Sequence, residues 1–100
     1  GPDRTITALV CANDDMAAGA LLAAHKAALR IPQDIAITGF DDTPVSEIVW
    51  PPLTTIHQPM AELAHTAAEI LIAGGEISHR RLPHQLIERA SVAPPFRRPA

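Results

Sequence analysis

The sequence predicts an α/β fold, a partial three-layer sandwich built around a mainly parallel β-sheet. Short apolar stretches rich in β-branched residues alternate with longer stretches of helical character. Proline and glycine separate these stretches, and carboxylate or amide residues follow three of the expected strands. Strands joined by helices form βαβ units, in which the strands are parallel and the crossover is right-handed. This alternation predicts helices packed on the faces of a sheet.

Composition limits both the fold and the partners of the chain. One hundred residues allow one domain, and 47% hydrophobic with 19% charged residues indicates a globular core. The net charge of −3 argues against a nucleic-acid-binding surface, which needs a basic face. No apolar run approaches the roughly 20 residues of a membrane helix, and the start GPDRT is not a signal peptide. Cys11, the only cysteine, is expected to pack in the core.

The first half of the chain predicts one βαβ unit. Residues 5–11 (TITALVC) and 35–40 (IAITGF) are apolar and β-branched, as buried strands are. Between them, residues 15–30 form an alanine-rich helix with Asp14 as its expected N-cap. Residues that precede proline avoid the helical region, so the Ile31–Pro32 pair is expected to end this helix, with a cation in its last turn.

The second half predicts a short helix, a strand, a long helix, a strand and a flexible tail. These elements cover residues 43–50, 53–57, 59–73, 85–89 and 93–100. Thr43 is expected to cap the short helix, with Pro44 at its first position. The long helix has an apolar stripe and ends at Gly74. The stripe consists of Met60, Leu63, Ala64, Ala67, Ile70 and Leu71.

Polar residues follow three of the expected strands. They are Asn13-Asp14-Asp15, Asp41-Asp42-Thr43 and His57-Gln58. In parallel sheets the carboxyl ends of the strands meet at one edge, where ligands bind. Asp41 directly follows the apolar Phe40 and is expected to face this edge, whereas Asp42 is expected to turn the chain into the short helix. Carboxylates and amides in such an arrangement suit vicinal hydroxyl groups, because they accept and donate hydrogen bonds at close range.

Other kinds of chemistry have weaker support. Aspartates at strand ends could hold Mg²⁺, as in a phosphotransfer or receiver-type domain that uses Asp41 and Asp42. However, no GxxxxGK[ST] loop is present, and the only lysine, Lys26, lies within a predicted helix. The five histidines show no i, i+4 pair, and neither CxxC nor a GxSxG elbow occurs. No metal ligand, cofactor or catalytic residue is therefore predicted.

Four motifs resemble the C-terminal region of LacI/GalR-type transcriptional regulators. They are ANDDMAAGA, IPQDIAITGFDD, PPLTTIHQP and LIERASV, in the family's order, between Thr5 and Val92. The resemblance implies one Rossmann-like lobe of the periplasmic-binding-protein type I fold, so that residues 1–92 form a C-terminal fragment of a sensor domain. In such domains the ligand lies between two lobes. The helix 59–73 is then expected to belong to the other lobe, and in this chain either to fold onto the sheet or to be buried in an oligomer.

The resemblance also implies a set of binding residues and partners. Asn13, Asp41 and Gln58 match positions that bind the polar groups of a small effector, a sugar in preference to a purine. The matching homodimer interface consists of Ala18, Leu21, Leu22, Pro44, Val45, Ile48 and Trp50. Operator DNA would be bound in the cytoplasm by an N-terminal helix-turn-helix, which these 100 residues do not contain. A fragment of a periplasmic sugar-binding protein is the alternative, because it shares the lobe fold.

Overall fold

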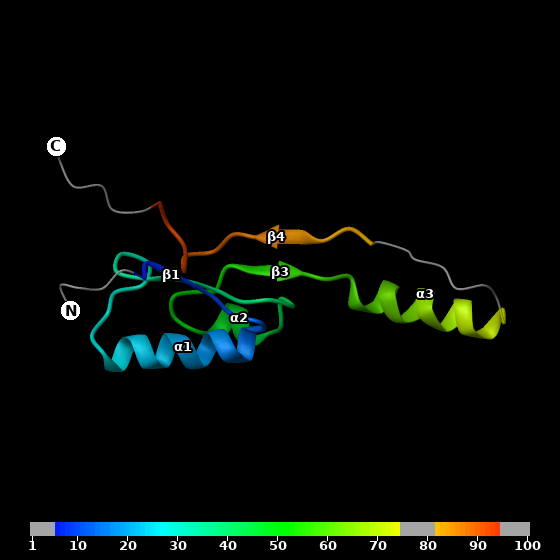
Figure 1. Ribbon diagram of the computed structural model, residues 1–100, viewed down its shortest axis with the longest axis horizontal. Coiled ribbons are helices and arrows are strands. Elements are labelled where there is room, and N and C mark those ends of the chain that lie inside the picture. The colour runs from blue at the N-terminus through cyan, green and yellow to red at the C-terminus, as the bar shows by residue number, and fades with distance from the viewer. Residues whose placement is uncertain (1–5, 75–81, 95–100) are drawn as a thin grey trace.

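A computed structural model of the chain describes residues 6–74 and 82–94. The elements occur in the order that the sequence predicts, which confirms the α/β class. They are β1 (Ala8–Val10), α1 (Asp14–Lys26), β2 (Ala36–Thr38), α2 (Val45–Ile48), β3 (Thr55–His57), α3 (Met60–Ile72) and β4 (Gln85–Ile87). The molecule measures 60 × 29 × 20 Å, and it is long because α3 extends away from the other elements (Figure 1).

The strands are three residues each, shorter than predicted, and they run mainly in parallel. β1 pairs with β2 in parallel, with Leu9 opposite Ile37. β2 continues to the segment around β3 through two isolated parallel bridges, Thr38 to Thr54 and Asp41 to His57. β4 then pairs antiparallel with β3. The carboxyl ends of β2 and β3 therefore meet at one edge, as the sequence predicts.

The core lies between α1 and the strands, and one side of α1 faces it. Ala17, Leu21 and Ala24 are buried from the helix, and they pack against Ile37 and Leu53. The spacing i, i+4, i+7 places these three side chains on one stripe of the helix. Leu21 is only 2% exposed, so its predicted place in a dimer interface is wrong. Its side chain is used by the core and is not available to a partner.

Both ends of α1 differ from the prediction. The N-cap is Asn13, whose Oδ1 accepts a hydrogen bond from the Met16 N–H at 2.8 Å, and not Asp14. The helix ends at Lys26, because Ala28 adopts a left-handed φ of 58° and breaks the helical repeat. Arg30 therefore lies beyond the last turn, where it forms an ion pair with Asp34 at 3.1 Å.

The cap of α2 also differs from the prediction. Pro44 occupies the N-cap position, and no side chain caps the helix. Thr43 cannot cap α2 because its hydroxyl donates to Asp14 Oδ2 at 3.0 Å, and its backbone N–H donates to the same oxygen at 2.6 Å. The carbonyl of Thr43 accepts the backbone N–H of Ser46 at 2.9 Å instead, which closes the turn.

Helix α3 has no buried residue, and its last two apolar side chains, Leu71 and Ile72, are 81% and 86% exposed. The apolar stripe does not fold onto the sheet, so that alternative is wrong; burial in an oligomer stays a prediction. Gly74 follows the helix with φ of 59°, the left-handed conformation that commonly ends helices. Among the described residues, no helix is long and apolar enough to cross a bilayer. Most of the predicted tail, residues 95–100, lies outside the described residues.

Candidate ligand-binding site

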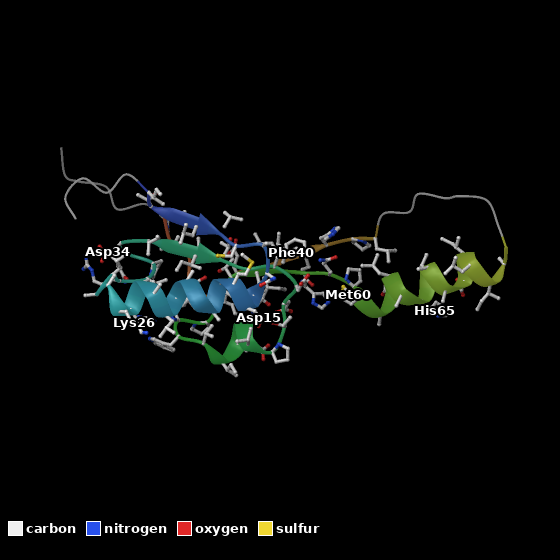
Figure 2. All side chains as sticks on the ribbon, turned by 60° about the horizontal axis from the view of Figure 1, so that its bottom comes forward. Asp15, Lys26, Asp34, Phe40, Met60 and His65 are labelled. Atoms are coloured by element: carbon white, nitrogen blue, oxygen red, sulfur yellow. The ribbon has the colours of Figure 1, made fainter. Side chains whose placement is uncertain are left out.

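A hollow of about 550 Å³ lies where the carboxyl end of β3 meets the start of α3. It is lined by Asp41, Asp42, Thr43, His57, Gln58, Pro59, Met60, Ala61 and Glu62. Figure 2 shows Phe40 and Met60 near this junction, and Lys26 and Asp34 at the far end of α1. The strand-end residues Asp41 and Gln58 are thus brought together as predicted, whereas Asn13 is not among the lining residues.

Asp41 and Gln58 are in direct contact in this hollow. Gln58 Nε2 donates to Asp41 Oδ1 at 2.8 Å, so the amide holds the carboxylate in one orientation. The backbone N–H of Asp41 donates to the Ile56 carbonyl at 2.9 Å, which attaches the residue to the chain before it enters α3. A fixed carboxylate beside a fixed amide offers acceptors and donors at a set spacing, which is what a hydroxyl-rich ligand requires.

The backbone at Asp41 and Asp42 is left-handed, with φ of 102° and 54°. Aspartate tolerates this region better than most residues, yet two in succession are uncommon. The turn directs the two carboxylates to different neighbours: Asp41 contacts Gln58, and Asp42 contacts Arg89 and His57. The two adjacent aspartates therefore have separate environments, in agreement with the predicted structural role of Asp42.

Asp42, whose side chain is 19% exposed, lies at the centre of a polar cluster. Arg89 Nη2 donates to Asp42 Oδ1 at 2.8 Å, His57 Nδ1 lies 3.2 Å from Oδ2, and Ser46 Oγ lies 3.2 Å from Oδ1. Burial favours the protonated acid, but the hydrogen bond and charge of Arg89, with the bonds from Ser46 and His57, hold the pKa of Asp42 below its usual value. Arg89 also donates to the Leu53 carbonyl at 2.9 Å.

This pKa shift predicts how stability depends on pH. Since the folded pKa of Asp42 is lowered, its ionised form stabilises the fold fully above the ordinary pKa of about 3.9. The contribution is lost as the pH falls through the folded value. We expect the wild type to be more stable than Asp42→Asn at pH 7, and the difference to shrink below about pH 4. Urea unfolding of both proteins between pH 7 and pH 3 measures this; a constant difference would contradict it.

Asp14, which the sequence predicts as the N-cap of the first helix, is instead a buried hydrogen-bond acceptor. Its side chain is 0% exposed and accepts hydrogen bonds from the Thr43 N–H at 2.6 Å, from Thr43 Oγ1 at 3.0 Å and from Thr55 Oγ1 at 2.7 Å. It joins the start of α1 to the loop before α2 and to β3. Among the described residues, no buried side-chain nitrogen or oxygen lacks a hydrogen-bond partner.

The aspartates do not assemble as the receiver-type alternative requires. Asp14 is enclosed by threonines, and Asp42 is neutralised by Arg89. In the part of the chain that the structure describes, no three histidine, cysteine, aspartate or glutamate residues gather as a metal site. Cys11 is half-buried beside the core, and burial raises the pKa of its thiol. The geometry at the edge of the sheet therefore suits a polar organic ligand.

The remaining predicted interface residues lie on α1 and around α2, two helices that contact each other. Leu22, Ile48 and Trp50 are 56%, 81% and 77% exposed. Ala18 and Val45 are half-buried, and Pro44 is exposed. His25 Nε2 lies 2.8 Å from the Trp50 carbonyl and so ties α1 to the segment after α2. The side chains of Leu22, Ile48 and Trp50 are therefore the exposed apolar groups among these predicted interface residues.

Residues 2–92 match the family of periplasmic binding protein-like domains. The transcriptional regulator MalR of Streptomyces coelicolor is 38% identical over 97 residues, which cover 90% of this chain and 28% of that protein. The chain thus spans less than a third of the length of this curated relative. It belongs to the periplasmic binding protein-like family, and the resemblance to LacI/GalR-type regulators is confirmed.

Two solved structures are similar to the chain throughout most of its length. A LacI family transcriptional regulator from Enterococcus faecium with bound ribose superposes with a TM-score of 0.80 and 35% identity, over 93% of this chain and 36% of that one. The lac repressor dimer bound to operator and the anti-inducer ONPF superposes with a TM-score of 0.77 and 38% identity, over 85% and 31%. These similarities confirm that the fold is one lobe of the periplasmic-binding-protein type.

Proposed function

We propose that this chain is the C-terminal part of the effector-binding domain of a LacI-type transcriptional regulator, and that its hollow binds a small sugar. The contact between Asp41 and Gln58 carries the proposal, because it fixes an acceptor and an amide at the edge of the sheet where ligands bind. The ribose bound to the similar regulator from Enterococcus faecium supports a sugar in preference to a purine.

Asn13 does not line the hollow, but it follows β1 at the same edge of the sheet. Its Oδ1 is used by the cap of α1, so its Nδ2 is the group that would donate to the effector. Helix α3 follows the hollow directly and buries no residue of its own. Both observations support a ligand held between this lobe and a second lobe, with residues 59–73 packed in the second lobe.

The whole protein would act as a homodimer on operator DNA in the cytoplasm. Effector binding would change the angle between the lobes and thereby the affinity for DNA, a coupling of about 1–3 kcal/mol in typical allosteric proteins. The exposed surface that includes Leu22, Ile48 and Trp50 supports dimerisation, since exposed apolar patches mark interfaces. Sedimentation velocity of the intact protein measures the oligomeric state, and a monomer at micromolar concentration would contradict this part of the proposal.

Removal of the Asp41 carboxylate is expected to weaken effector binding by about 10- to 100-fold, because a charge-assisted hydrogen bond contributes about 1.5–3 kcal/mol. Isothermal titration of the intact protein with ribose, other sugars and purine bases measures the affinity of wild type and Asp41→Ala. Asp15→Ala is the matched control, since Asp15 is an exposed aspartate of α1 and does not line the hollow. Equal affinities for wild type and Asp41→Ala would disprove the role of Asp41, and binding of purines alone would disprove the sugar.

A further inference from the structure

The turn at Asp41 and Asp42 is held by contacts from several segments. Left-handed conformations of non-glycine residues are unfavourable and persist only where the surrounding structure holds them. The N–H of Asp41 donates to the Ile56 carbonyl at 2.9 Å, and that of Asp42 donates to Thr55 Oγ1 at 3.3 Å. The next residue, Thr43, is held by Asp14 Oδ2 through its N–H at 2.6 Å and its hydroxyl at 3.0 Å. The bond to the N–H of Asp42 itself is long, so the contacts of the Asp42 side chain add to the restraint on this residue.

Arg89 is the residue best placed to hold that side chain. Its backbone is fixed to Thr54, because its N–H donates to Thr54 Oγ1 at 2.8 Å and its carbonyl accepts from the same hydroxyl at 3.2 Å. Its side chain is 16% exposed, and its guanidinium donates to Asp42, to Ser46 Oγ at 2.9 Å and to the Leu53 carbonyl. An arginine whose backbone and guanidinium are both held by hydrogen bonds can orient the carboxylate that it pairs with.

The other charged groups near this pair leave it as the dominant contact. Glu47 Oε1 lies 3.6 Å from Arg89 Nη2, but its side chain is 72% exposed. His57 approaches the second oxygen of Asp42 and directly precedes Gln58, which holds Asp41. Asp42 is therefore held between Arg89 and His57, while Asp41 contacts Gln58; both aspartates line the hollow.

We propose that Arg89 is a positioning residue for effector binding: through Asp42 it holds the left-handed turn in which Asp41 meets Gln58. Arg89 need not touch the effector, and its effect on affinity passes through the orientation of the Asp41 carboxylate. The effect on affinity rests on the proposed function of the hollow. The effect on the turn does not, so the two can be tested separately.

Hydrogen–deuterium exchange of the intact protein tests the turn without any ligand. Arg89→Gln is expected to raise the exchange rate of a peptide that contains residues 41–43 at least fivefold, while a peptide from within α1 changes less than twofold. Arg30→Gln is the matched control, since it removes an aspartate-paired arginine that is exposed and lies outside the hollow. Unchanged exchange at residues 41–43, or an equal rise in α1, would overturn the proposal. Should Arg89→Gln not fold, Asp42→Asn provides the same comparison.

Titration with D-ribose tests the route by which Arg89 acts. Arg89→Gln is expected to weaken ribose binding about tenfold in the wild-type background and less than twofold in an Asp41→Ala background. Equal losses in both backgrounds would show that Arg89 does not act through Asp41, which would overturn the proposal. If wild type binds no ribose but exchange at residues 41–43 responds to Arg89→Gln, the choice of ribose fails and the positioning of the turn stands.

Discussion

Asp14→Ala is expected to lower the free energy of unfolding by about 3 kcal/mol or more, since a buried donor left without a partner costs about 1–3 kcal/mol. Three donors, the Thr43 N–H, the Thr43 hydroxyl and the Thr55 hydroxyl, would lose their acceptor at the same time. Asp14 is fully buried, so water cannot easily replace the lost oxygens. A urea unfolding curve of the variant and the wild type gives the difference.

The adjacent aspartate provides the control for this experiment. Asp15 lies in the same first turn of α1 but is exposed, so Asp15→Ala should cost less than about 1 kcal/mol, the size of a helix-dipole interaction. Asp14→Asn keeps one oxygen acceptor and should fall between the two. Equal losses for Asp14→Ala and Asp15→Ala would mean that the bonds to Thr43 and Thr55 contribute nothing.

Local patterns were enough to predict the order of the elements and the edge at which polar residues gather. Strand and helix periodicity is a property of neighbouring residues, and the parallel crossover then determines which strand ends meet. For this reason Asp41 and Gln58 were expected on one edge although 17 positions separate them in the chain, and the structure places them in contact. Their role in effector binding remains a prediction.

The direction of individual side chains could not be predicted in the same way. Asn13, Asp14 and Asp15 are all acceptable helix-start residues, and only the position of β3 decides which one turns inward. Leu21 and Leu22 are neighbours of identical type in a helix with many alanines, so the apolar stripe is too diffuse to separate them. The structure buries the first and exposes the second.

Arg89 was missed for a different reason. Its partner Asp42 lies 47 positions earlier in the chain, and a single sequence contains no signal that pairs them. The local indications are that Arg89 follows apolar residues of a predicted strand, where its aliphatic part can be buried while its charge needs a partner, and that it belongs to the LIERASV motif. The length of α3 was predicted well, but its separation from the sheet could not be, since an apolar stripe does not specify what covers it.

Gly39→Ala is expected to destabilise the chain by about 1–3 kcal/mol, the usual cost of an added group in a well-packed interior. A Cβ at this position would overlap Asp14 Oδ1 and would lie 2.9 Å from Leu53 Cδ2 and 3.1 Å from the Asp14 Cα. Gly39 is also fixed by its N–H, which donates to the Thr54 carbonyl at 2.9 Å. Neither the backbone nor Asp14 can move without the loss of hydrogen bonds.

The effects of Asp14→Ala and Gly39→Ala on stability should therefore not be additive. In an Asp14→Ala background the overlap with Oδ1 is absent, so Gly39→Ala should cost clearly less there than in the wild type. Gly19→Ala is the matched control, because a Cβ at Gly19 meets nothing within 4 Å, and alanine in a helix is favoured over glycine by about 1 kcal/mol. Urea unfolding should thus show opposite signs for the two glycine substitutions. A neutral Gly39→Ala, or full additivity with Asp14→Ala, would show that the approach of Asp14 to Gly39 is not what excludes a side chain at this position.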